Sequence, residues 1–180
     1  MSYNNISSVS DVIFPSSLTY LSLLSNSITS LPALRFTDPN SVSLQGLHLA
    51  TNPFSNISGD VFSHLTNLTY LDLSGIPLTS ASVDQLSLPA SLVILNLGST
   101  GLTHLPSNLP TLPKLRNLVL DGMPRLTCDC HRDRHLLEWY QEIDPIVQID
   151  GDCHFRFSIR HVEDFLSDYK SFCFLESLLG

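Results

Sequence analysis

The residues best suited to chemistry are four cysteines in the last third of the chain. Cys128 and Cys130 are one residue apart, and Cys153 and Cys173 follow after 22 and 19 intervening residues. Four cysteines in this arrangement either form disulfides, as in secreted domains, or bind a metal as thiolates. Three disulfide pairings are open to them. The bridge between Cys128 and Cys130 is the least favourable pairing, because closing a bridge across one residue is strained.

A zinc site is the alternative use of these cysteines. Histidines lie close to them in sequence, and the candidate zinc ligands are Cys128, Cys130, His131, His135, Cys153 and His154. Zinc sites more often space two cysteines by two residues than by one, which favours disulfides. The acids Asp144, Asp150 and Asp152 offer oxygen ligands for calcium, but such a run is more typical of a solvated loop.

A repeated pattern precedes the cysteines. The motif LxxLxLxx begins at residues 18, 44, 68, 92 and 115, so successive copies are 26, 24, 24 and 23 residues apart. Leucines two apart face one side of a short strand, and a single repeat cannot bury them alone, so the repeats must stack. We predict an α/β-type solenoid, a right-handed superhelix with a parallel concave sheet of about five strands.

The turn after each strand normally carries an asparagine that bonds to backbone groups. Asn26 and Asn52 occupy that position in the first two repeats, and Thr100 is a partial substitute in the fourth. Ile76 and Met123 have no polar group to offer. This difference predicts a looser turn in the later repeats.

The composition changes near residue 121, which marks a domain boundary. The net charge is −2 over residues 1–120 and −6 over residues 121–180. We assign residues 1–123 to the repeats, the first of them partial, 124–173 to a cysteine-rich flank and 174–180 to a tail. The first residues match the back half of a repeat without its strand or a cap. We therefore expect the chain to be a fragment or to have an incomplete N-terminus.

Residues 124–173 resemble the cysteine-rich C-terminal flank of extracellular leucine-rich-repeat proteins such as Slit, the Nogo receptor and Toll-like receptor ectodomains. The matching residues are Pro124, Cys128, Cys130, Trp139, Cys153 and Cys173. Arg156 and His161 depart from the pattern, where a proline and a glycine are common. The resemblance implies disulfides Cys128–Cys153 and Cys130–Cys173 in a C-terminal cap. We expect Trp139 to cover the apolar end of the fifth repeat.

Composition narrows the classes of partner and location. Apolar residues make up 43% of the 180 residues, charged residues 14%, and the net charge is −8. An acidic chain is poorly suited to binding nucleic acid or an anionic membrane, because both partners are negatively charged. No signal peptide or membrane-spanning run is visible, so we expect no membrane insertion by this chain. The cysteines and the glycosylation sequons at Asn5, Asn56 and Asn67 favour an extracellular or cell-surface location.

The concave sheet is the expected binding surface, because variable side chains between the leucines point outward from it. Tyrosine is favoured at protein interfaces, since a large apolar ring ends in a hydrogen-bonding group. The candidate partner-binding residues are Tyr20, His48, Tyr70, Asp72, Asn96 and Asn117. The predicted function is a non-enzymatic extracellular module that binds a protein. The alternative is an intracellular scaffold with reduced or zinc-bound cysteines.

One row of this surface has the residue types of a hydrolase triad. Ser22, His48 and Asp72 fall on consecutive strands in the order nucleophile, base and orienting acid. An open sheet supplies no oxyanion hole and does not exclude water, so we expect no catalysis. No nucleotide- or phosphate-binding motif is visible elsewhere, and we expect no cofactor.

Overall fold

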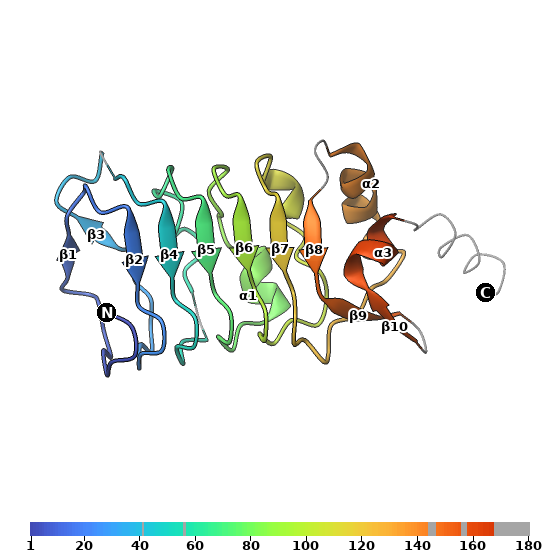
Figure 1. Ribbon diagram of the computed structural model, residues 1–180, viewed down its shortest axis with the longest axis horizontal. Helices are drawn as coiled ribbons and strands as arrows, with labels where there is room; N and C mark the ends of the chain where they lie inside the picture. The colour runs from blue at the N-terminus through green and yellow to red at the C-terminus, as the bar shows by residue number, and fades with distance from the viewer. Residues whose placement is uncertain (41, 56, 144–146, 156–157, 168–180) are drawn as a thin grey trace.

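The computed structural model describes residues 1–180 except 41, 56, 144–146, 156–157 and 168–180. Its main feature is a parallel six-stranded sheet that runs along one side of a stack of coils (Figure 1). Each coil contributes one three-residue strand. In spatial order these are β2 (Tyr20–Ser22), β4 (Gly46–His48), β5 (Tyr70–Asp72), β6 (Ile94–Asn96), β7 (Asn117–Val119) and β8 (Gln148–Asp150).

The repeated leucines form the core in columns. Leu21, Leu47, Leu71, Leu95 and Leu118 pair across neighbouring strands and are all buried. A second column lies two residues further along each repeat and is also buried: Leu23, Leu49, Leu73, Leu97 and Leu120. Because every coil buries its leucines against the next, the sheet register follows directly from the repeat spacing.

The sheet has one strand more than the five expected from the repeats, because β8 continues it. Ile149 pairs with Leu118 and is fully buried, so it takes the leucine position of a sixth coil. The segment Gln148–Asp150 has one apolar residue and lacks the LxxLxLxx motif. The strand therefore comes from the cysteine-rich flank and extends the concave face towards the C-terminus.

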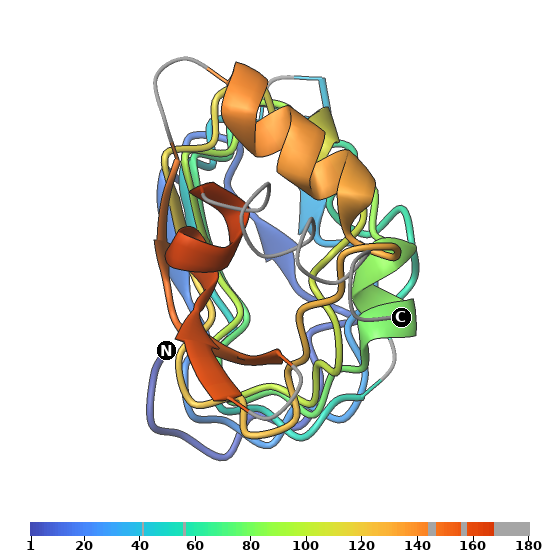
Figure 2. The same cartoon turned by 90° about the vertical axis from the view of Figure 1, so that its right-hand side faces the viewer.

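The opposite side of the solenoid is formed mainly by turns and short elements. Figure 2 shows α1 (Ser80–Asp84) on the side away from the sheet. The 3-10 helix η1 (Leu109–Thr111) lies in the following coil. At the N-terminal end, β1 (Ile13–Phe14) pairs in parallel with β3 (Arg35–Phe36).

The C-terminal end is covered by the flank (Figure 2). Its elements are α2 (Arg134–Glu142), the antiparallel hairpin of β9 (Asp152–Phe155) and β10 (Ser158–His161), and α3 (Val162–Ser167). The fully buried side chains of α2 are Leu136 and Leu137, with Tyr140 nearly so. Trp139 packs against this core but is only partly buried, and that it covers the end of the fifth repeat stays a prediction. Ile149 and Phe165 are fully buried in that part of the core.

In each complete repeat, the third residue after the strand lies in the left-handed backbone region. This residue is serine, threonine or glycine, with φ of 52° at Ser25, 56° at Thr51 and 65° at Gly75. Glycine stands at this place in the two repeats that lack the asparagine or threonine, before Ile76 and Met123. The later turns thus keep the same backbone conformation, and the looser turn stays a prediction. Glycine lowers the backbone strain where no side chain bonds to the turn.

Substituting Gly75 with alanine is expected to lower the free energy of unfolding by about 1 kcal/mol, because a Cβ is strained at φ of 65°. Urea unfolding measures the change. Ser25→Gly is the matched control and is expected to change stability by less than about 0.5 kcal/mol, since relief of strain and the greater entropy of the unfolded chain oppose each other. An unchanged Gly75→Ala midpoint would contradict the proposed role of this glycine.

Candidate partner-binding face

Three aromatic rings form a ladder across the first three strands of the concave sheet. The ring centroids of Tyr20 and His48 are 5.3 Å apart, and those of His48 and Tyr70 are 4.6 Å apart in a stacked arrangement. Gly46 makes room for the first ring: a Cβ there would lie 2.5 Å from a Tyr20 ring carbon. Tyr20 remains 54% exposed, so the ladder presents aromatic surface to solvent.

Asp72 holds this ladder in place. One carboxylate oxygen lies 3.1 Å from His48 Nδ1, and the other accepts hydrogen bonds from the Ser74 backbone N–H at 3.0 Å and the Ser74 hydroxyl at 2.7 Å. Since a carboxylate only accepts hydrogen bonds, His48 Nδ1 carries a proton. In the neutral ring, Nε2 is then the acceptor. Asp72 itself is buried and positions the histidine.

The same environment changes the acidity of Tyr70. Burial, followed by the Asp72 charge, raises the pKa of the Tyr70 phenol to about 12. The neutral phenol is the form that the folded state favours. Its contribution to stability is therefore complete below pH 10 and is lost as the pH rises towards 12.

Replacing Asp72 with asparagine is expected to lower the pKa of Tyr70 only part of the way to 10. Burial is the largest cause of the shift and remains, while the repulsion between carboxylate and phenolate disappears. Ultraviolet absorbance of phenolate during alkaline titration measures the pKa of Tyr70. Tyr140, whose pKa is also raised to about 12 by burial and Glu163, is the internal control. A Tyr70 pKa that does not move would exclude Asp72 as a cause.

The triad residues lie on neighbouring strands, but the serine has another partner. Ser22 pairs in register with His48 and His48 with Asp72. The Ser22 hydroxyl is 2.6 Å from the Ser2 hydroxyl, and no hydrogen bond between Ser22 and His48 is present among the described residues. The His48–Asp72 contact therefore belongs to the aromatic ladder.

The remaining candidate residues lie further along the sheet. Asn96 follows Asp72 in the same row, and its side-chain oxygen accepts a hydrogen bond from the Gly98 N–H at 2.9 Å. Asn117 is separate from the ladder and donates to the side chain of Gln148 at 3.1 Å. Sequence reasoning missed Gln148 and Asp150, because β8 lacks the leucine motif.

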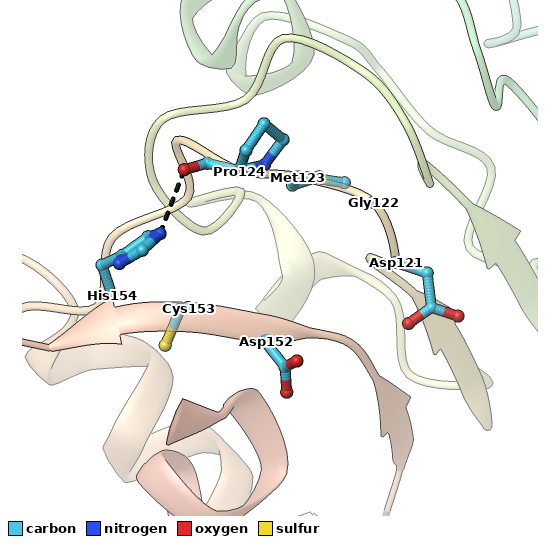
Figure 3. A pocket seen from close by; sticks show the side chains of 7 residues that line it. All are labelled: Asp121, Gly122, Met123, Pro124, Asp152, Cys153 and His154. Carbon is cyan, nitrogen blue, oxygen red and sulfur yellow. Dashed lines mark hydrogen bonds between the residues drawn. The ribbon is translucent and has the colours of Figure 1, made fainter. Parts of the chain in front are cut away.

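A pocket with two acids lies beside the C-terminal end of the concave sheet. It has a volume of about 300 Å³ and opens between the turn after β7 and the start of β9 (Figure 3). Asp121 and Asp152 line it, together with His154, whose Nε2 is 3.0 Å from the Pro124 carbonyl oxygen. The two acids thus lie next to the last strands of the sheet, at the opposite end from the aromatic ladder.

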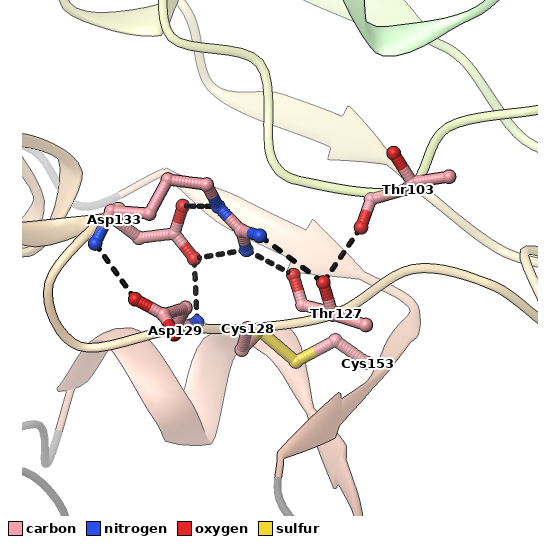
Figure 4. Close-up of a disulfide and its surroundings, with 7 residues drawn as sticks. Thr103, Thr127, Cys128, Asp129, Asp133 and Cys153 are labelled. Atoms are coloured by element: carbon pink, nitrogen blue, oxygen red, sulfur yellow. Dashed lines mark hydrogen bonds and ion pairs between the residues drawn. A yellow bond between two sulfur atoms is a disulfide. The ribbon is translucent and has the colours of Figure 1, made fainter.

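A disulfide fixes the flank beside this pocket. Cys128 and Cys153 are bonded as predicted (Figure 4), with their Cα atoms 5.7 Å apart. Cys130 is also disulfide-bonded, and its predicted partner Cys173 lies outside the described residues. These cysteines are therefore not available as thiolate ligands. Within the described ranges, no three His, Cys, Asp or Glu residues are grouped to hold a metal ion.

The three sequon asparagines differ in their surroundings. Asn5 is exposed, and its side-chain oxygen accepts a hydrogen bond from Ser27. Asn67 is exposed, but its side-chain nitrogen, the atom that would carry a glycan, donates to the Val42 carbonyl at 2.8 Å. Asn56 lies outside the described residues. In the described part of the chain, no helix is long and apolar enough to cross a membrane.

Known proteins share these repeats. A model of the family described as leucine rich repeat matches residues 16–78 and 42–102. The probable serine/threonine-protein kinase pats1 of Dictyostelium discoideum is 41% identical over 108 residues, which are 58% of this chain and 3% of the kinase. Keratocan of Danio rerio is 33% identical over 109 residues, which are 59% of this chain and 29% of keratocan.

A solved structure agrees with the fold. The protein LIC12759 of Leptospira interrogans, a leucine-rich-repeat protein, superposes with a TM-score of 0.54 at 31% identity and covers 75% of this chain and 31% of its own. The chain spans less than a third of the length of each of these three proteins. The repeated motif, the stacked parallel sheet and the family match together show that residues 16–102 of this chain are leucine-rich repeats.

Proposed function

We propose that this chain is a non-enzymatic module of an extracellular or cell-surface protein and that it binds a protein partner through its concave sheet. The observation that carries the proposal is the ladder of Tyr20, His48 and Tyr70. Rings locked by stacking and by Asp72 lose little conformational entropy on binding. Aromatic residues of this kind are frequent anchors of protein interfaces.

The charge on the face suggests what the partner presents. The aromatic end offers hydrogen bonding through the tyrosine hydroxyls and His48 Nε2. The opposite end carries Asp121 and Asp152 beside the pocket. A partner with polar groups opposite the ladder and basic side chains opposite these acids fits both ends, because complementary charges favour association.

The extracellular location is supported by the chemistry of the flank. Disulfides persist in oxidising compartments, and Cys128, Cys130 and Cys153 are disulfide-bonded. The exposed sequon at Asn5 fits the same location. An intracellular scaffold with reduced cysteines is the competing function. A non-reducing peptide map of secreted protein, with a glycosidase step, distinguishes the two functions. Disulfides and glycans would support the extracellular module, and free thiols without glycans would support the intracellular scaffold.

A screen of the secreted chain against purified extracellular ectodomains tests the binding face. For any partner found, Tyr20→Ala/Tyr70→Ala is expected to weaken binding at least tenfold, because interface anchors contribute about 2 kcal/mol or more each. Tyr3→Ala is the matched control, since Tyr3 is 77% exposed and lies outside the concave sheet. Undiminished binding by the double variant would place the interface elsewhere on the solenoid.

A further inference from the structure

A second surface lies between η1 and α2, away from the pocket that Asp121 and Asp152 line. A shallow groove of about 500 Å³ runs between η1 and α2. Pro110 and Pro113 form one wall, and Trp139 with Glu138 and Glu142 forms the other. The groove therefore combines an indole, two proline rings and two carboxylates with the His135 imidazole and the Ile143 side chain.

Trp139 is not among the deeply buried side chains of α2. Leu136, Leu137 and Tyr140 provide the buried side of α2, and Tyr140 meets the indole edge to face with ring centroids 6.4 Å apart. The indole is only partly buried against the core, and the rest of it lines the groove. The largest aromatic side chain of the protein is thus held by its neighbours with part of its surface available.

The two glutamates place negative charge beside that indole. Glu138 and Glu142 are four residues apart on α2, so they share one face of the helix and repel one another. Neither takes part in an ion pair among the described residues. A cation seated between them would relieve this repulsion. It would also meet the aromatic surface of Trp139, which attracts cations.

We propose that this groove binds an arginine side chain presented by an extended, proline-rich segment of a partner protein. A guanidinium is planar, so it stacks on the indole while its N–H groups reach the carboxylates. Proline rings of the segment would pack against Pro110 and Pro113, because an extended proline helix docks in aromatic and apolar grooves at little entropic cost. This surface is independent of the concave face.

The test uses the intrinsic fluorescence of the intact chain, since Trp139 is its only tryptophan. The probe is the peptide acetyl-Pro-Pro-Arg-Pro-Pro-amide, compared with the same peptide containing citrulline, which has the same shape without the charge. The arginine peptide is expected to shift the emission and to bind at least fivefold more tightly than the citrulline peptide. Equal binding of the two, or no change in emission at millimolar peptide, would overturn the proposal.

A matched pair of variants separates local from general electrostatics. Glu138→Gln/Glu142→Gln keeps the tryptophan probe and is expected to remove the preference for arginine, with about a tenfold loss of affinity. Asp11→Asn/Asp38→Asn changes the net charge equally at two exposed acids near the N-terminal end and is expected to leave binding unchanged. Equal loss in both variants would show that net charge, and not this groove, attracts the peptide.

Discussion

Replacing Asn52 with alanine is expected to lower the free energy of unfolding by about 4 kcal/mol. The side chain is 2% exposed and bonds to four backbone groups of two coils, the weakest of them the Ala50 carbonyl at 3.3 Å. Its nitrogen donates to the carbonyl oxygens of Leu49 at 2.8 Å and Leu23 at 3.0 Å, and its oxygen accepts from the Ile28 N–H at 3.1 Å. Each buried group left without a partner costs about 1–3 kcal/mol. Chemical denaturation followed by circular dichroism measures the loss.

The fourth repeat supplies the control. Thr100 occupies the equivalent position and donates one hydrogen bond to a backbone carbonyl, that of Leu97 at 2.8 Å. Thr100→Ala is therefore expected to cost about 1 kcal/mol. If the two substitutions proved equally mild, the bonds of Asn52 between coils would not be a main source of stability.

The repeats could be predicted from sequence because their signal is local and repeated. The leucine spacing sets the strand register, and the register alone brings Tyr20, His48, Tyr70 and Asp72 together. The leucine spacing does not predict the geometry of the side chains on the sheet. The stacking of the rings and the burial of Asp72 depend on packing that becomes visible only in three dimensions.

The features that could not be predicted lie in the flank, where no repeat constrains the chain. β8 could not be predicted, because a single apolar residue, Ile149, fills a position defined by its neighbours on β7. Trp139 packs against the core as a partly buried residue, while Leu136, Leu137 and Tyr140 are the deeply buried side chains of the helix, a division that sequence spacing alone does not predict. The Cys128–Cys153 pair was predictable only through the family resemblance.

Removing that disulfide with Cys128→Ala/Cys153→Ala is expected to destabilise the protein by about 3 kcal/mol, because the bridge closes a loop of roughly 25 residues. The loss should appear first in the flank. Trp139 fluorescence reports on the flank and circular dichroism on the repeats. We expect the two unfolding curves to coincide in the native protein and to separate in the variant.

The separation follows because the bridge is a covalent tie between β9 and the segment that leaves the fifth repeat, whereas links such as the hydrogen bond from the His154 N–H to the Leu126 carbonyl at 2.7 Å are weaker. Thr127 donates to the Thr103 carbonyl at 2.8 Å, and Arg132 ties Thr127 to the buried carboxylate of Asp133 (Figure 4). Thr127→Val removes the hydroxyl contact, leaves the disulfide and is expected to cost about 1 kcal/mol with coincident curves. Coincident curves in the cysteine variant as well would mean that packing against the fifth coil, and not the bridge, holds the flank in place.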